Sequence, residues 1–120
     1  MRRFFFSAAL LLLASSNLHA TEALLFNGGG YNIQIMVGYE DNPVVAQVFF
    51  MPPGAKDRVV LPREGLQIEK FDTEKKILTI RFSNKNNPDL PASFSFSAKS
   101  SKALLSINGK EIKSEFNWDI

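Results

Sequence analysis

Cysteine is absent from the sequence, and the single histidine is His19. Zinc, copper and iron prefer cysteine and histidine ligands, and the same residue types supply the nucleophile and the base of many covalent mechanisms. Disulfides are excluded as well, although small secreted eukaryotic domains commonly depend on them. An Asn-x-Ser/Thr glycosylation acceptor is also missing. The chain after His19 therefore has no thiol or imidazole chemistry, and we expect no cofactor.

A hydrophobic run long enough to cross a membrane is missing too, because a spanning helix needs about 20 apolar residues. The apolar run Phe4–Ala14 follows Arg2 and Arg3 and precedes a short polar stretch that ends at Ala20. A positive start, a short apolar centre and a small final residue are typical of a cleavable secretory signal. We therefore predict that residues 1–20 are a signal peptide and that the mature chain is bacterial, periplasmic or secreted, and not inserted into a membrane.

An excess of one charge is lacking once this segment is removed. The whole chain has 14 basic and 12 acidic residues, and Arg2 and Arg3 are lost with the signal, so the remainder has 12 of each. Nucleic-acid binding needs a basic surface that neutralises phosphates, and membrane-surface binding needs a basic face. We therefore expect neither kind of partner.

Helical spacing of apolar residues is scarce, whereas alternation with a period of two runs along most of the chain. The pair Asn108-Gly109 is the strongest hairpin signal, since both positions of a two-residue turn need positive φ. We predict that residues 21–120 form one all-β domain, a small antiparallel β-sandwich or partly open barrel of about eight short strands. The expected strands are 31–39, 44–51, 58–61, 66–71, 76–82, 92–98, 103–107, 110–113 and 114–118, with 21–26 either a turn or a further short strand.

The alternation also assigns faces within the strand 44–51. Val44, Ala46, Val48 and Phe50 fall on one side, which we expect to be the core side. Phe49 and Met51 fall on the other side with Val45 and Gln47, and the alternation leaves open whether that side is covered.

Candidate catalytic and metal sites are few. Ser97-Ala98-Lys99 has a Ser-x-Lys spacing, but it lies in a segment of small residues that we expect to be solvated. We therefore interpret it as a turn. Asn84–Asp89 and Glu40–Asn42 offer oxygen ligands without the spacing of a known calcium loop, and Asn and Asp are ordinary turn formers. Gly28–Gly30 leads into a strand rather than a helix, so it does not match a phosphate-binding loop. We expect no metal site and no enzyme.

The function class that these exclusions leave is recognition of a partner through the protein surface. The connection Met51–Gly65 contains three prolines and two glycines, and prolines order the backbone and lower the entropic cost of docking. Its charged residues, which include Arg63 and Glu64, suit the polar rim of an interface. Tryptophan is a frequent hot-spot residue, although one near the end of a small sandwich more often belongs to the core. The expected partner-binding residues are Met51, Pro52, Pro53, Lys56, Asp57, Arg58 and Trp118.

These features suggest a function by analogy with known classes of small exported proteins. A small, neutral, exported all-β protein is similar in kind to periplasmic lysozyme inhibitors and to immunity proteins against toxins that degrade the cell wall. We expect a non-catalytic protein, monomeric or homodimeric, that binds a hydrolase and inserts the loop Pro52–Arg58 into its active site. One alternative is a structural or assembly subunit of the envelope, such as an adhesin or pilus component, that pairs strands through residues 92–98. Another is a small-ligand carrier in which Tyr31, Tyr39, Phe94 and Phe96 line a cavity.

Overall fold

The computed structural model of the chain describes residues 22–118. The predicted signal peptide lies outside these residues. Within them, no helix is long and apolar enough to cross a membrane. The elements are β1 (Glu22–Gly28), β2 (Tyr31–Tyr39), β3 (Pro43–Met51), β4 (Val59–Val60), a short 3₁₀ turn η2 (Arg63–Gly65), β5 (Leu66–Asp72), β6 (Ile77–Phe82), β7 (Phe94–Lys99), β8 (Lys102–Ile107) and β9 (Lys110–Glu115).

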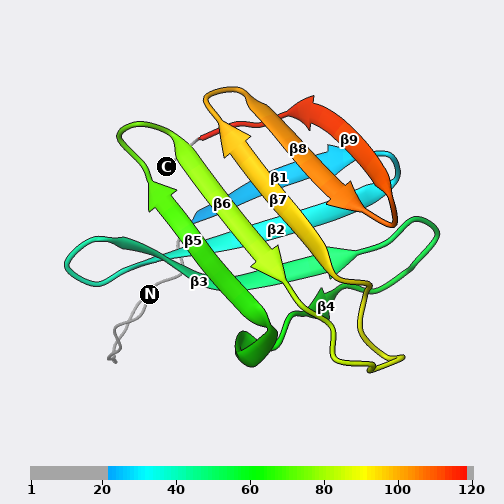
Figure 1. Ribbon diagram of the computed structural model, residues 1–120. Helices are drawn as coiled ribbons and strands as arrows, with labels where there is room; N and C mark the ends of the chain where they lie inside the picture. The colour runs from blue at the N-terminus through cyan, green and yellow to red at the C-terminus, as the bar shows by residue number, and fades with distance from the viewer. Residues whose placement is uncertain (1–21, 119–120) are drawn as a thin grey trace, which may run out of the picture.

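The strands form two antiparallel sheets, and within each sheet the paired strands are consecutive in sequence. Sheet A has the order β1-β2-β3-β4, and sheet B has the order β5-β6-β7-β8-β9. Sheet B lies in front of sheet A in Figure 1, and the strands of the two sheets cross at a steep angle. The predicted all-β, sandwich-like class is therefore confirmed, as two sheets joined by the η2 segment.

The core lies between the inner faces of the two sheets. Phe26 of sheet A meets Phe96 of sheet B edge to face, with ring centroids 5.3 Å apart. Phe50 of sheet A stacks on Phe94 of sheet B at 5.1 Å. Alternation places these rings on one side of each strand, and burying them together removes a large apolar area from water. The remaining buried residues are Leu24, Ile33, Ile35, Val37, Val48, Leu61, Leu78, Ile80, Phe82, Ala98, Ala103, Leu105, Ile107, Phe116 and Trp118.

A β-bulge changes the inner face of β3. Met36 pairs with Gln47 but Val37 pairs with Val45, so Ala46 is an extra residue in the ladder. Val45 then packs against the core, whereas Val44 and Ala46 lie on the outer side, within 4.0 Å and 3.4 Å of where a Cβ of Gly38 would be. The predicted core face is thus right for Val48 and Phe50 and wrong for Val44 and Ala46.

Two-residue turns close the hairpins at both ends of the chain. Asn108 and Gly109 have φ of 53° and 74° and join β8 to β9, as predicted. Gly29 and Gly30 have φ of 59° and 84° and join β1 to β2, with Gly28 opposite Tyr31. The glycine run therefore forms the tip of the β1–β2 hairpin.

The predicted last strand, 114–118, is wrong in its bounds. The strand β9 continues through Ser114 and ends at Glu115. Beyond it, the backbone N–H of Phe116 donates to the carbonyl of Ser101 at 2.8 Å, and the aromatic side chains of Phe116 and Trp118 fill the core without a paired strand.

The turn between β5 and β6 gives a testable pH dependence. The carboxylate of Asp72 accepts the backbone N–H groups of Glu74 and Lys75, each at 3.0 Å. These bonds, that of Lys75 first, lower the pKa of Asp72 from its ordinary 3.8. Because the pKa is lower in the folded state, this carboxylate stabilises the fold above its ordinary, unfolded-state pKa and loses that contribution as the pH falls through the folded-state pKa.

We therefore expect NMR titration of the side-chain carboxyl to give a pKa for Asp72 below its ordinary value. The destabilisation caused by Asp72→Ala, measured by thermal denaturation, is expected to be larger at pH 7 than in acid below that pKa. A pKa at or above the ordinary value would contradict this description of the turn.

Candidate protein-binding surface

The first half of the β3–β4 connection forms a tight, ordered turn. The N–H of Ala55 donates to the carbonyl of Pro52 at 3.2 Å, and Gly54 has φ of 80°. Proline at the second position and a positive φ at the third are the marks of a type II turn, in which glycine is the favoured third residue. The Pro-Pro-Gly sequence thus fixes the corner locally.

This turn rests on the tip of the β1–β2 hairpin. A Cβ placed on Gly30 would lie 3.0 Å from the Cβ of Pro53, so the two segments are already in close contact. Because Gly30 also has positive φ, a side chain there would strain the backbone and displace Pro53. The hairpin tip therefore fixes the base of the turn.

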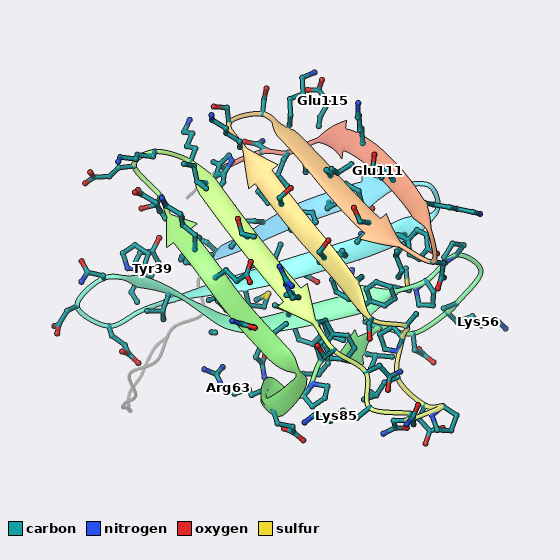
Figure 2. The ribbon with its side chains drawn as sticks, viewed as in Figure 1. Tyr39, Lys56, Arg63, Lys85, Glu111 and Glu115 are labelled. Carbon is teal, nitrogen blue, oxygen red and sulfur yellow. The ribbon has the colours of Figure 1, made fainter. Side chains whose placement is uncertain are left out.

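Charged side chains follow the turn and point into solvent. Lys56, Asp57 and Arg58 are all exposed, and none of them forms an ion pair with another residue of the described chain. Figure 2 shows Lys56 extending away from the body of the protein. We refer to Pro52–Arg58 as the charged turn.

The second half of the connection is docked against β3. Val59 and Val60 pair with Phe50 and Phe49, and the N–H of Leu61 donates to the carbonyl of Val48 at 2.9 Å.

The side chain of Arg63 continues this docking along β3. Its Nη1 donates to the carbonyl of Ala46 at 2.9 Å, at the bulge. A guanidinium only donates hydrogen bonds, so it can pair with the Ala46 carbonyl, which the bulge leaves outside the ladder. Figure 2 places Arg63 far from Lys56. The structure therefore does not bring Arg63 together with the charged turn, and its contact serves the fold.

The outer face of sheet A is uncharged. Its outward positions are Ala23, Leu25, Asn27, Asn32, Gln34, Met36, Gly38, Val44, Ala46, Gln47, Phe49, Met51 and Val60. One cross-strand row crosses all four strands, from Leu25 through Gln34 and Phe49 to Val60. Leu25 and Val60 are 45% and 48% exposed, and Met51 leads directly into the charged turn. We refer to these outward residues as the uncharged face.

Sequence reasoning missed the uncharged face as a site, although its signal is readable. Soluble sheets usually carry polar or charged residues on the side that faces water. The alternate residues of 23–36 and 47–51 carry amides and apolar groups only, and the order of residues alone shows this pattern.

Trp118 lies elsewhere, in the core. It is 8% exposed, its ring contacts Phe116 at 5.5 Å and Phe71 at 6.3 Å, and its indole N–H donates to the carbonyl of Ser100 at 2.7 Å. Figure 1 shows the segment that follows β9 at the top of the molecule, away from the β3–β4 connection. The structure therefore brings Met51, Pro52 and Pro53 together with Lys56–Arg58 but not with Trp118.

The segment Asn84–Asp89, considered above as a calcium loop, is organised by the side-chain amide of Asn84. The Nδ2 of Asn84 lies 3.1, 3.3 and 2.7 Å from the carbonyl oxygens of Asn87, Leu90 and Pro91, and its Oδ1 accepts the N–H of Asn87 at 2.9 Å. The amide nitrogen thus takes the central place among these carbonyls. Within residues 22–118 there is no group of three acidic, histidine or cysteine side chains suited to a metal ion.

The structure bears on the two alternative functions, strand pairing through residues 92–98 and a ligand cavity lined by aromatic residues. The strand β7 pairs with β6 on one side and β8 on the other, so residues 94–99 offer no free edge to a donated strand. Phe94 and Phe96 pack against other core rings, Tyr31 contacts Phe50 at 5.9 Å, and the Tyr39 hydroxyl donates to the Glu22 carboxylate. The four aromatic residues therefore do not line a common cavity.

The Ser-x-Lys pair lies on the outer face of β7, so the interpretation of Ser97–Lys99 as a turn is wrong. Ser97 and Lys99 are both exposed and occupy alternate positions of this strand. No hydrogen bond joins them in the described chain, and neither is enclosed by the core.

Comparisons with known proteins provide no assignment. No family model, no curated protein and no solved structure matches the chain. The functional argument therefore rests on the residues of this chain.

Proposed function

We propose that this protein is exported, is not an enzyme, and acts by binding another protein through the charged turn and the adjoining uncharged face. One observation carries the proposal: a fixed turn with exposed charged side chains stands at the border of a sheet face that has no charged residue. Protein interfaces combine a core depleted of charge with a polar rim, and this surface has both parts side by side.

The expected action is inhibition. The turn is fixed by Pro52, Pro53 and Gly54, so its docking loses little conformational entropy. Lys56 and Arg58 have no ion-pair partner in the described chain and are available to a carboxylate of the target. Cell-wall hydrolases of the lysozyme type use paired carboxylates in a cleft, and an exported inhibitor would meet such enzymes. We therefore propose a hydrolase of this class as the target.

The direct test uses the mature protein as bait in a periplasmic extract, followed by activity assays of the hydrolases that are recovered. We expect a hydrolase to co-purify and to lose activity at an equimolar ratio. Recovery of no hydrolase, together with full activity of tested lysozyme-like enzymes, would contradict the proposal.

The double variant Lys56→Ala/Arg58→Ala tests the role of the turn. Both side chains are exposed and neither forms an ion pair within the described residues, so we expect an unchanged melting temperature. We expect at least a tenfold loss of affinity for the partner, about 1.4 kcal/mol or more, because a target carboxylate would lose its cations. Isothermal titration calorimetry measures the affinity.

Lys85→Ala is the matched control, since Lys85 is exposed in the β6–β7 connection and lies away from Lys56 in Figure 2. Equal affinity of the double variant and the wild type would remove the turn from the interface.

A further inference from the structure

The outer face of sheet B contains a hollow that the proposed function does not use. It has a volume of about 810 Å³ and lies over β6, β7, β8 and β9. Small-molecule sites commonly measure roughly 300–1,000 Å³. The strands cross the hollow side by side, so its width is set by three steps of about 4.8 Å between neighbouring strands.

The side chains at the centre of the hollow are short and uncharged. One cross-strand row places Thr79 opposite Ser97, and Ser97 opposite Leu104. Ala98 and Ala103 also line it, although their side chains point to the core, so the floor reaches the backbone of the sheet. Leu104 and Ile77 are half-buried and supply the apolar part of the floor.

Long cationic side chains border this floor. Lys99 lies directly opposite Lys102 on the neighbouring strand, and Lys113 lies opposite Leu104. Among charged residues, the lining contains these three lysines and Glu115, which gives a formal excess of two positive charges.

The lysine pair is only partly compensated. Like charges directly opposite each other on paired strands destabilise a sheet. Glu115 contacts the Nζ of Lys102 at 3.4 Å, but no carboxylate of the described chain pairs with Lys99 or Lys113. A bound anion would relieve this repulsion.

From this geometry we propose that the hollow binds an anionic amphiphile with a single alkyl chain. The chain lies over Leu104 and the small residues of the floor, and the headgroup lies between Lys99 and Lys113. The lining contains no aromatic ring on which a sugar could stack, and its excess of positive charge attracts anions and repels cationic ligands. This site is separate from the charged turn, so it stands independently of the proposed function.

The probe is decanoate, used below its micelle concentration and followed by ¹H–¹⁵N NMR of the mature protein. We expect saturable shifts centred on the amides of Thr79, Ser97, Leu104 and Lys113. Acetate supplies the headgroup alone, and decyl maltoside carries a ten-carbon chain on an uncharged headgroup. Neither is expected to produce these shifts at the same concentration.

The variant Lys99→Gln/Lys113→Gln replaces both exposed lysines with somewhat shorter, uncharged polar side chains. We expect it to weaken decanoate binding about five- to tenfold, since two exposed ion pairs are lost. Lys85→Gln is the matched control and should bind as the wild type does. Inhibition of a protein partner should be unchanged in both variants.

Three results would overturn the proposal: equal decanoate affinity of the double variant and the wild type, stronger shifts on the uncharged face of sheet A than in the hollow, or binding of an acidic peptide but not of decanoate. The folding of each variant is verified from the dispersion of its own spectrum.

Discussion

Replacing Phe96 with alanine is expected to lower the free energy of unfolding by about 3–5 kcal/mol. Phe96 is 1% exposed and lies in the central strand of sheet B, where its ring contacts Phe26 of sheet A and Phe116 beyond β9. Removal of the ring leaves a cavity between the two sheets, and the sheets cannot both move to fill it. Urea denaturation followed by circular dichroism measures the loss.

Phe49→Ala is the matched control for this prediction. Phe49 lies half-buried on the outer face of sheet A, between Gln34 and Val60. We expect a cost of about 1 kcal/mol, because part of its area is already in water. The same variant should weaken partner binding, since Phe49 is in the centre of the uncharged face. Equal destabilisation by the two substitutions would contradict the assignment of inner and outer faces.

Replacing Asn84 with alanine is expected to cost about 2–3 kcal/mol. Its side chain is within hydrogen-bond distance of three carbonyls and accepts one N–H of the same connection, and the bonds to Leu90 and Pro91 are partly buried. Without the amide, the carbonyls of Leu90 and Pro91 lose their donor in a partly buried place. Denaturation measures the cost, and amide exchange should become faster across residues 85–93.

Asn86→Gly controls for a general effect on this connection. Asn86 is exposed and has φ of 63°, which glycine adopts without strain. We expect its stability to stay within about 0.5 kcal/mol of the wild type. If Asn84→Ala were equally harmless, the amide would not organise the connection.

The sequence predicts the strands well because the alternation is strong where one face is buried. Ile33, Ile35 and Val37 mark β2, and Asn108-Gly109 marks a turn whose dihedral angles only a few residue types accept. The bulge at Ala46 could not be predicted, since it depends on the register between two strands and not on the pattern within one. The end of β9 was misplaced for a related reason: Phe116 and Trp118 alternate as a strand does, but they fill the core without pairing.

The candidate site was predicted in part. Pro-Pro-Gly fixes a turn by local chemistry, so the order and exposure of Pro52–Arg58 follow from the sequence. The role of Arg63 does not, because its acceptor is a carbonyl seventeen positions earlier that only the folded sheet brings near. The uncharged face lies between these cases, since its residues are readable from the alternation but its continuity across four strands requires the register.

The order of the strands also bears on how fast the chain folds. Each ladder joins strands that are consecutive in sequence, so most pairings form by closing short loops. The main exception is the seam between the first and last strands, where the hydroxyl of Ser114 donates to the carbonyl of Asn27 across a separation of 87 residues. Closing so long a loop costs the most chain entropy, so we expect each sheet to assemble from its own hairpins and the two ends of the chain to meet last.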